Sequence, residues 1–299
     1  MSRSKGFVTI ATGDKRYFEI ARNLLYSYRQ FCSINYPFTI ICDQENEYTK
    51  EFDEVILLDK AYCSYLDKLK LYDYLPYDDT IFIDADSLAY GDLDKWWDIF
   101  KEADDFSLFG YMWTDLECQR GWFIPDGVKE YRNKVSYIPD FNGGVYYIRK
   151  SEVSKEVFRL ANYFATHFNE YSFNGFTSPA DEPVLALAMA VCNCRPLDLK
   201  EICFAPKGKQ INADIRIPKA YYIRNKNSRY DVNLIHWSNY KTKQSLYKFE
   251  VEKLLYLKEN RSTDTLFYRL MYQYKFKYYI LKPLDIFSFA GRVKHKIFK

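Results

Sequence analysis

The sequence predicts an α/β fold, in which a mostly parallel sheet is flanked by helices, followed by a helical C-terminal extension. The first reason is that strand and helix patterns alternate up to about residue 110, which is typical of parallel sheets. The second is that Asp84 and Asp86 directly follow an apolar run, where a buried strand should end. The third is that residues 261–299 differ from the rest in charge and aromatic content.

The first elements follow from hydrophobic spacing. Residues 7–11 form a short apolar run that predicts a strand, and residues 17–31 carry apolar side chains three and four positions apart, which predicts a helix. The same patterns continue along the chain. They predict strands at 38–42, 55–58 and 80–83, and helices at 65–75 and 93–100.

Residues 111–140 break this alternation. The segment contains Trp113, Trp122, Phe123 and two prolines with mixed charge, which predicts a long functional loop rather than a linker. We expect these aromatic rings to contact a ligand; buried packing of the rings is an equal alternative.

Regular structure is expected to resume after the loop. Residues 144–149 predict a strand, and Ser151 is a good N-cap for a helix that continues to about residue 168. Residues 181–192 predict a second helix with Pro183 in its first turn. We therefore expect one domain over residues 1–245 and a helical extension over residues 246–299.

Charge is distributed unevenly. The chain of 299 residues has a net charge of +3, but residues 261–299 hold nine Lys/Arg and two Asp, a charge of +7 that leaves −4 for the rest. Seven cysteines without metal-finger spacing indicate reduced thiols and a cytoplasmic protein. The longest apolar run has nine residues, whereas a spanning helix needs about 20, and no secretory signal is visible.

Two carboxylates at a strand exit predict a metal site. In an extended segment residues i and i+2 point the same way, so Asp84 and Asp86 can share one divalent cation. His236 follows Leu234 and Ile235, a short strand that would end near the same edge. An imidazole beside two carboxylates favours Mn²⁺, with Mg²⁺ as the alternative. Taken alone, the two aspartates are equally well explained as part of a solvated turn, and a core histidine is the commoner explanation of His236.

Several segments together resemble a known enzyme family. They are 8–12 followed by Asp14 and Tyr17, Lys68 sixteen residues before Asp84, the 82–86 segment, the 139–145 segment, Asp181-Glu182, and 234–237. In this order and spacing, residues 5–245 resemble the GT-A glycosyltransferases, most closely family 8, the glycogenin and lipopolysaccharide galactosyltransferase type. The resemblance implies a Rossmann-like sheet and transfer of a hexose from a nucleotide sugar, a UDP-sugar, to a glycan or lipid-linked glycan. Acceptor choice would then lie in the 111–140 loop, whose aromatic rings would stack on sugar faces.

The resemblance also implies roles for individual residues. The nucleotide would contact Ala11, Thr12, Asp14, Tyr17, Lys68 and Ala85, and the donor sugar would contact Asp140, Asn142, Gly143 and Gly144. The diphosphate would contact Lys241 and Lys243. The metal would be held by Asp84, Asp86 and His236, and the catalytic residues would be Asp181 and Glu182. Glycines 143 and 144 would let backbone approach a sugar closely. Tyr17 on an amphipathic helix is equally well explained as a core residue.

Two departures from the family pattern affect these expectations. The family usually carries Asp-Gln where this chain has Asp181-Glu182, and a second carboxylate could act as the general base of an inverting enzyme. The rest of the pattern favours retention. The family places Gly and Lys after the histidine at positions where this chain has Asn239 and Thr242. The resemblance therefore does not extend to the diphosphate contacts expected of Lys241 and Lys243.

The C-terminal extension is expected to bind a membrane surface. Residues 261–299 interleave ten Phe/Tyr with the nine basic residues, a combination typical of peripheral attachment to anionic lipid at the inner face of the membrane. Nucleic-acid binding is the rival interpretation, which we do not expect. A third interpretation is that the extension has no binding role and forms a helical hairpin that packs on the catalytic domain.

Three functions are therefore considered. The leading one is a metal-dependent glycosyltransferase of surface polysaccharide biosynthesis. The first alternative is a phosphatase of the haloacid dehalogenase type, in which a strand also ends in Asp-x-Asp; here, however, two strand–helix units precede the motif and Ser87-Leu88 follows it. The second alternative is a catalytically silent glycan-binding relative.

Overall fold

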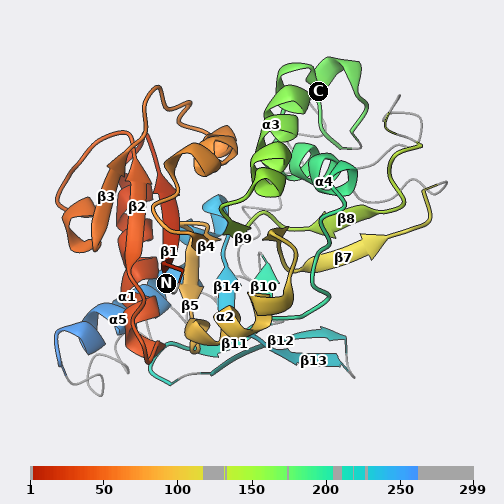
Figure 1. Cartoon of the computed structure of the whole chain (residues 1–299). Coiled ribbons are helices and arrows are strands. Elements are labelled where there is room, and N and C mark those ends of the chain that lie inside the picture. The colour runs from red at the N-terminus through yellow and green to blue at the C-terminus, as the bar shows by residue number, and fades with distance from the viewer. Residues whose placement is uncertain are drawn as a thin grey trace, which may run out of the picture.

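A six-stranded sheet forms the centre of the computed structural model, which describes residues 3–116, 131, 133–173, 175–204, 211–217, 219–225 and 228–261 (Figure 1). Its strand order is β3-β2-β1-β4-β9-β6. The bounds are β1 Lys5–Ala11, β2 Phe38–Cys42, β3 Glu54–Leu57, β4 Asp79–Ile83, β6 Phe106–Ser107 and β9 Val145–Arg149. The first four strands pair in parallel, and β9 runs antiparallel to both β4 and β6. The predicted mostly parallel sheet is confirmed.

Helices cover both faces of this sheet, so its central strands are apolar on both sides. Alternate residues of one strand face opposite cores: Phe7 packs with α1 and α5, whereas Val8 packs in the core that contains α3 and α4. The helices are α1 Lys15–Phe31, α2 Trp96–Ile99, α3 Glu152–Thr166, α4 Asp181–Val191 and α5 Ser245–Lys258. The 3₁₀ helices are η1 Thr49–Glu51, η2 Tyr65–Tyr74, η3 Leu93–Lys95, η4 Phe100–Glu102, η6 Phe168–Glu170 and η7 Asn239–Lys243.

Three smaller sheets surround the exit of β4. One has the order β10-β14-β5, with β5 Ser87–Ala89, β10 Ile202–Phe204 and β14 Leu234–His236. Another is a meander of β11 Ile211–Asp214, β12 Lys219–Asn225 and β13 Ser228–Asp231. The last pairs β7 Gly110–Trp113 with β8 Ile138–Phe141. The pairing of β14 with β5 and the turn that follows β8 bring residues from later in the chain to the edge where β4 ends.

Local predictions hold best where a single pattern decides the structure. The strand at 38–42 is confirmed, and Ser151 caps α3 by accepting a hydrogen bond from the Ser154 amide. The predicted helix at 93–100 is instead divided into η3, α2 and the start of η4, because Asp92 caps one short turn and the next begins at once. The segment at 65–75 is helical, as predicted, but coils as the 3₁₀ helix η2.

The prediction of a loop over residues 111–140 is wrong at both ends. Tyr111 pairs with Asp140 and Trp113 with Ile138, so the segment begins and ends as an antiparallel pair of strands. Sequence reasoning misses this pairing because the two strands are four residues each and more than 20 residues apart. Trp122 and Phe123, expected to contact an acceptor, lie outside the described residues.

The beginning of the expected C-terminal extension packs on the main body. Helix α5 contacts α1, and its Tyr247 and Leu254 are buried in the same core as Phe7 (Figure 1). The division at residue 245 stays a prediction, and the basic aromatic residues 262–299 lie outside the described part of the chain. Among the described residues, the helices are all too short or too polar to cross a bilayer.

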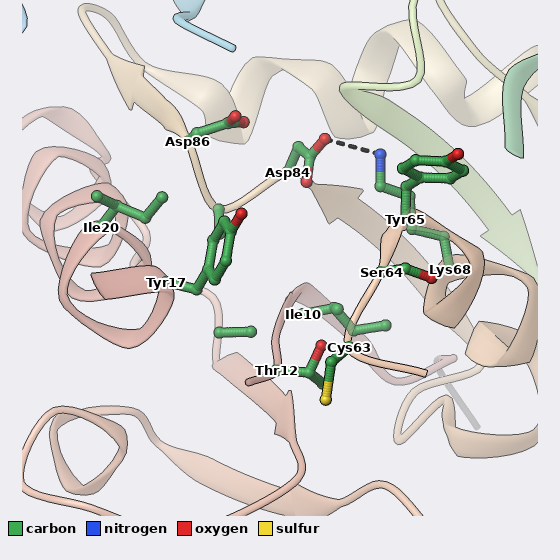
Figure 2. Close-up of a pocket in the computed structure, with 12 residues that line it drawn as sticks. Ile10, Thr12, Tyr17, Ile20, Cys63, Ser64, Tyr65, Lys68, Asp84 and Asp86 are labelled. Carbon is green, nitrogen blue, oxygen red and sulfur yellow. Dashed lines mark hydrogen bonds and ion pairs between the residues drawn. The ribbon is translucent and has the colours of Figure 1, made fainter. Parts of the chain in front are cut away.

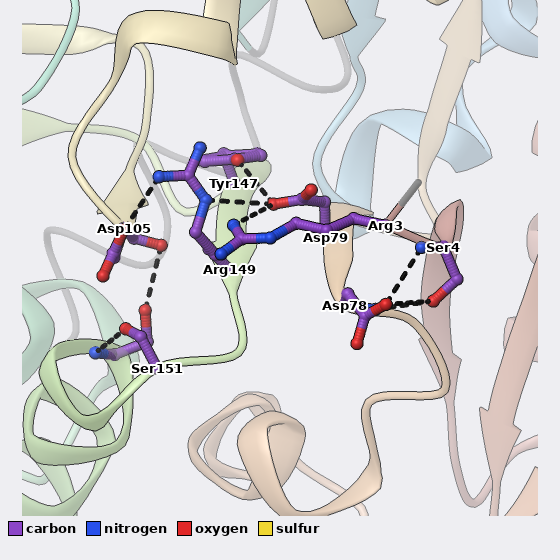
Figure 3. Close-up of polar contacts among 9 residues, drawn as sticks. Arg3, Ser4, Asp78, Asp79, Asp105, Tyr147, Arg149 and Ser151 are labelled. Carbon is purple, nitrogen blue, oxygen red and sulfur yellow. Dashed lines mark hydrogen bonds and ion pairs between the residues drawn. The ribbon is translucent and has the colours of Figure 1, made fainter. Parts of the chain in front are cut away.

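A polar cluster closes the opposite end of the sheet, where β4 begins (Figure 3). Asp79 accepts hydrogen bonds from the Tyr147 hydroxyl at 2.8 Å and from Arg149 Nε at 3.1 Å. Arg149 also donates to Asp105 at 2.9 Å, and the Asp105 carbonyl accepts from Ser154 Oγ. These contacts join β4, β9 and α3, so β4 is held at one end while its other end presents Asp84.

Candidate active site

Strand pairing brings His236 to the two aspartates. Strand β5 begins at Ser87, directly after Asp86, and pairs antiparallel with β14 so that Ser87 lies opposite His236. The Trp237 amide then donates to the Asp86 carbonyl at 2.9 Å. The register of these two short strands therefore places an imidazole from near the end of the described chain beside a motif at residues 84–86.

The three side chains have the geometry of a metal site. One ligand atom from each of Asp84, Asp86 and His236 lies within 4.8 Å of the others. His236 Nε2 is 2.8 Å from Asp86 Oδ1 and 3.6 Å from Asp84 Oδ2. His236 Nδ1 lies 2.6 Å from the Asn142 side-chain oxygen, an acceptor, which assigns a ring proton to Nδ1 and directs Nε2 toward the carboxylates.

This arrangement fits a divalent cation. Asp86 Oδ1 is buried, and His236 Nε2 lies only 2.8 Å away. At that distance a nitrogen and a carboxylate oxygen need a proton or a cation between them. The mixed nitrogen and oxygen donor set suits Mn²⁺ and also Zn²⁺, and is less suited to Mg²⁺.

Burial and charge act in opposite directions on these groups. Burial raises the pKa of Asp84 despite the adjacent Lys68 amine. Burial also opposes ionisation of Asp86, but the neighbouring His236 lowers the pKa of this carboxyl overall. Burial disfavours the charged form of His236, yet Asp86 raises its pKa above the ordinary value. Protonated His236 and ionised Asp86 therefore stabilise each other, and a divalent cation bound here would take the place of the proton on Nε2.

Lys68 supplies a positive charge at this site from η2. Its amine lies 2.7 Å from Asp84 Oδ2, 3.1 Å from Asp181 Oδ2 and 3.1 Å from the Gly143 carbonyl (Figure 2). An ammonium group has three N–H donors, so these contacts use all of them. The contact between Lys68 and the nucleotide stays a prediction; in this structure the amine joins the Asp84 carboxylate to the start of α4.

Asp181 and Glu182 lie at the N-terminus of α4, as expected, and each holds a different partner. Asp181 Oδ2 accepts from the Tyr146 hydroxyl at 3.0 Å, and Glu182 Oε1 accepts from the Gly143 amide at 2.7 Å. Burial, followed by the charge of Asp181, raises the pKa of Glu182. Sequence reasoning missed Tyr146, because one tyrosine in the apolar strand β9 carries no separate signal.

The two glycines are required by close contacts within the site itself. A Cβ on Gly143 would lie 2.6 Å from the Tyr146 hydroxyl and 2.8 Å from Asp181 Oδ2. A Cβ on Gly144 would lie 2.8 Å from His236 Nδ1. All three distances are too short for a side-chain carbon, so any larger residue would displace Tyr146, Asp181 or His236. Contact of these glycines with a sugar stays a prediction.

A cavity of about 400 Å³ opens beside Asp84 and Asp86 (Figure 2). Five of the six residues expected to bind a nucleotide line it: Ala11, Thr12, Tyr17, Lys68 and Ala85. The structure adds residues that sequence reasoning did not select, namely Ile10, Ile20, Cys63, Ser64 and Tyr65. The cavity thus lies between the exit of β1 and the exit of β4, and Tyr17 and Tyr65 contribute aromatic rings to it.

The remaining expected site residues lie around this centre. Asp14 is exposed and caps α1 by accepting from the Arg16 amide at 2.9 Å. The Thr12 hydroxyl donates to Asp67 at 2.9 Å. Asp140 is exposed on β8, two residues before Asn142. Lys241 is buried and Lys243 exposed, both on η7. The roles expected for these residues are not tested by their positions.

Comparison with known proteins finds similar architectures but no assigned family. No protein-family model matches the sequence, and no curated protein matches it. Solved structures with a similar architecture include the bifunctional glycosyltransferase WbbM, at 13% identity over 80% of this chain and 46% of that one, with a TM-score of 0.49. The chain spans about half the length of that structure.

Two further structures with a similar architecture are also glycosyltransferases. The galactosyltransferase LgtC, in complex with donor and acceptor sugar analogs, is 12% identical over 78% of this chain and 87% of that one, with a TM-score of 0.49. Mouse xyloside xylosyltransferase 1 is 11% identical over 79% and 98%, with a TM-score of 0.48. At these values the likeness assigns neither activity nor substrate, and membership of family 8 stays a prediction.

Proposed function

We propose that this chain is a metal-dependent glycosyltransferase that transfers a hexose from a UDP-sugar to a glycan or a lipid-linked glycan. The observation that carries the proposal is the position of Asp84, Asp86 and His236, which together form a metal-binding cluster at the edge of the 400 Å³ cavity. A nucleotide sugar has the parts that such a site would recognise: a flat base for aromatic rings and a diphosphate for a cation.

The residues of the site have complementary tasks in this proposal. Tyr17 and Tyr65 line the part of the cavity that would receive the base. Asp84, Asp86 and His236 would hold Mn²⁺, which when bound stabilises negative charge on a diphosphate leaving group. The Asn142 side chain fixes the ring of His236, so the nitrogen that faces the carboxylates stays a ligand.

Glu182 and Asp181 support different parts of the reaction centre. Glu182 holds the Gly143 amide, and Asp181 is held by both Lys68 and Tyr146. These contacts favour a positioning role for Asp181. We propose retention of anomeric configuration, because the motif pattern resembles a retaining family, and the raised pKa of Glu182 makes this carboxyl the candidate base if the outcome is inversion.

The phosphatase alternative has less support. It requires the first aspartate to attack phosphorus, whereas Asp84 Oδ2 lies 2.7 Å from the Lys68 amine and 3.6 Å from His236 Nε2. A histidine in the cation cluster is also uncharacteristic of an all-oxygen Mg²⁺ site. The catalytically silent alternative is tested by the assay of donor hydrolysis.

Attachment to the cytoplasmic face of an anionic membrane is the second part of the proposal. It rests on the +7 charge and ten aromatic residues of the segment 261–299, nearly all of which lies outside the described residues. Such attachment would place the active site near a lipid-linked acceptor.

The decisive experiment is hydrolysis of donor alone. The full-length protein is incubated with a panel of UDP-hexoses and Mn²⁺, and release of UDP is measured. We expect slow hydrolysis of at least one donor that excess chelator abolishes. Hydrolysis of p-nitrophenyl phosphate without turnover of any nucleotide sugar would favour the phosphatase, and binding of a UDP-hexose without turnover would favour the silent relative.

A further inference from the structure

A group of tyrosines lies outside the donor cavity. Tyr111 on β7, Tyr222 on β12 and Tyr230 on β13, together with Lys200, form what we call the tyrosine surface. Tyr111 is 41% exposed, and Tyr222 and Tyr230 are half-buried. In Figure 1, β7 and the β12–β13 pair extend toward the same side of the molecule. Exposed aromatic groups of this kind mark binding surfaces more often than chance.

The four side chains form a connected arrangement. The Lys200 amine lies 5.4 Å from the ring centre of Tyr111 and 5.2 Å from that of Tyr230. Tyr230 in turn stacks on its cross-strand neighbour Tyr222, with ring centres 5.1 Å apart. Cation–π contacts hold the amine between two rings that belong to different sheets. Within the described part of the chain Lys200 forms no ion pair with a carboxylate, and its amine hydrogen-bonds to the Tyr111 side chain. Its positive charge can therefore still pair with an anionic ligand.

The tyrosine surface is connected to the metal cluster along two paths. Tyr111 pairs with Asp140, and two residues further along the chain Asn142 contacts His236 Nδ1. Lys200 lies two residues before β10, whose Phe204 pairs in register with His236 and packs edge-on against its ring, with ring centres 6.1 Å apart. Both ends of the surface are thus a few residues from the proposed reaction centre.

We propose that Tyr111, Lys200 and Tyr230 bind the acceptor glycan, and that Lys200 selects acceptors that carry a carboxylate or phosphate. The proposal rests on the proposed glycosyltransferase function and names the chemistry of its second substrate. Sugar rings present flat C–H faces to aromatic side chains, and tyrosine offers a rigid, amphipathic surface at a small cost in conformational entropy. An ammonium held beside two such rings, with no carboxylate partner among the described residues, adds recognition of an anionic group.

A glycan array tests this proposal separately from catalysis. Full-length protein is applied to arrayed neutral oligosaccharides and to oligosaccharides containing uronic acid or phosphate, and donor hydrolysis is measured in parallel. We expect binding to anionic glycans that falls at least tenfold in the Tyr111→Ala, Tyr230→Ala double variant. The hydrolysis of UDP-hexose by that variant should stay within twofold of wild type, which shows that the donor site is intact.

Matched variants identify the contribution of each group. Tyr163→Ala on α3 removes a tyrosine of similar exposure, 37%, and should bind glycans as wild type does. Tyr111→Trp should retain binding, since it keeps an aromatic face. Lys200→Met should lose the preference for anionic over neutral glycans. The proposal is overturned if wild type binds no arrayed glycan while it hydrolyses donor, if binding is unchanged in the double variant, or if only anionic liposomes are bound.

Discussion

The amine of Lys68 lies 2.7 Å from Asp84 Oδ2 and 3.1 Å from Asp181 Oδ2, although the three residues come from η2, the exit of β4 and the start of α4. A single positive charge therefore links the proposed metal cluster to the proposed catalytic carboxylates. A divalent cation bound by Asp84 would compete with Lys68 for the same oxygen. The position of Lys68 should then depend on whether metal is bound.

The metal cluster is tested by substitution of its aspartates. Asp86→Asn should abolish Mn²⁺-dependent hydrolysis of UDP-hexose, because an amide oxygen is a much weaker ligand than a carboxylate. UDP release measured at several Mn²⁺ concentrations provides the readout. Asp98→Asn, which changes an exposed aspartate on α2, is the control. Full activity of Asp86→Asn would rule out the assigned site.

The role of Glu182 is tested by Glu182→Gln together with the anomeric configuration of the product. We expect retention, and a loss of less than about tenfold in rate, because a glutamine oxygen can still accept from the Gly143 amide. The configuration is read from the product by NMR. An inverted product together with a loss of about 100-fold or more would instead identify Glu182 as a general base.

Removal of the Lys68 amine should destabilise the metal-free protein. Lys68→Met leaves the carboxylates of Asp84 and Asp181 without their buried partner, which typically lowers the free energy of unfolding by about 3–5 kcal/mol. Mn²⁺ should restore part of this loss. Urea unfolding with and without Mn²⁺ measures both effects. Lys70→Met, at a partly exposed lysine whose amine contacts backbone carbonyls and the ring of Tyr62, should change stability by less than about 1 kcal/mol.

Acid should weaken the contact between β11 and α5. Burial opposes ionisation of Asp214, but Arg216 and Lys253 lower its pKa from 3.8 to about 2. A lowered folded pKa gives stability that is complete above about pH 4 and is lost as the pH falls toward 2. Asp214→Asn should therefore cost about 2 kcal/mol at pH 6, with the side chain 24% exposed, and progressively less toward pH 2.

The control variant for the Asp214 prediction is Asp231→Asn, which changes a carboxylate that is 73% exposed and paired with Arg229. This variant should differ from wild type by less than about 1 kcal/mol at either pH, because exposed ion pairs contribute little. Equal losses at pH 6 and pH 2 in Asp214→Asn would show that the pairing with Arg216 and Lys253 does not act through charge. Urea unfolding at the two pH values gives the answer.

Membrane attachment is tested by truncation after Arg261. Helix α5 ends at Lys258 and packs on α1, so a chain cut after Arg261 should fold and hydrolyse donor normally. Full-length protein should sediment with anionic liposomes at about 0.1 M salt and less at about 1 M, where the Debye length falls from about 10 Å to about 3 Å. The truncated chain should stay in the supernatant. Sedimentation of both chains alike would show that residues 262–299 are not the attachment site.

The sequence by itself determined the elements whose signals are local. The apolar run before Asp84 predicts β4, whose opposite faces direct Ile81 and Phe82 into different cores. Ser151 predicts the start of α3. Such signals depend on residues one to four positions apart, and these distances are set by strand and helix geometry alone. The placement of His236 came from resemblance to a family, because nothing within the 234–237 segment distinguishes a ligand from a core histidine.

Tertiary structure decided which side chains meet. Lys68 reaches Asp181 only because η2 and α4 pack on the same face of the sheet, and Tyr146 reaches the same carboxylate because β9 is inserted beside β4 in the reverse direction. His236 reaches Asp86 through the register of β5 and β14. Strand order and register depend on burial summed over the whole chain, so residues more than 100 positions apart acquire contacts that no local pattern encodes.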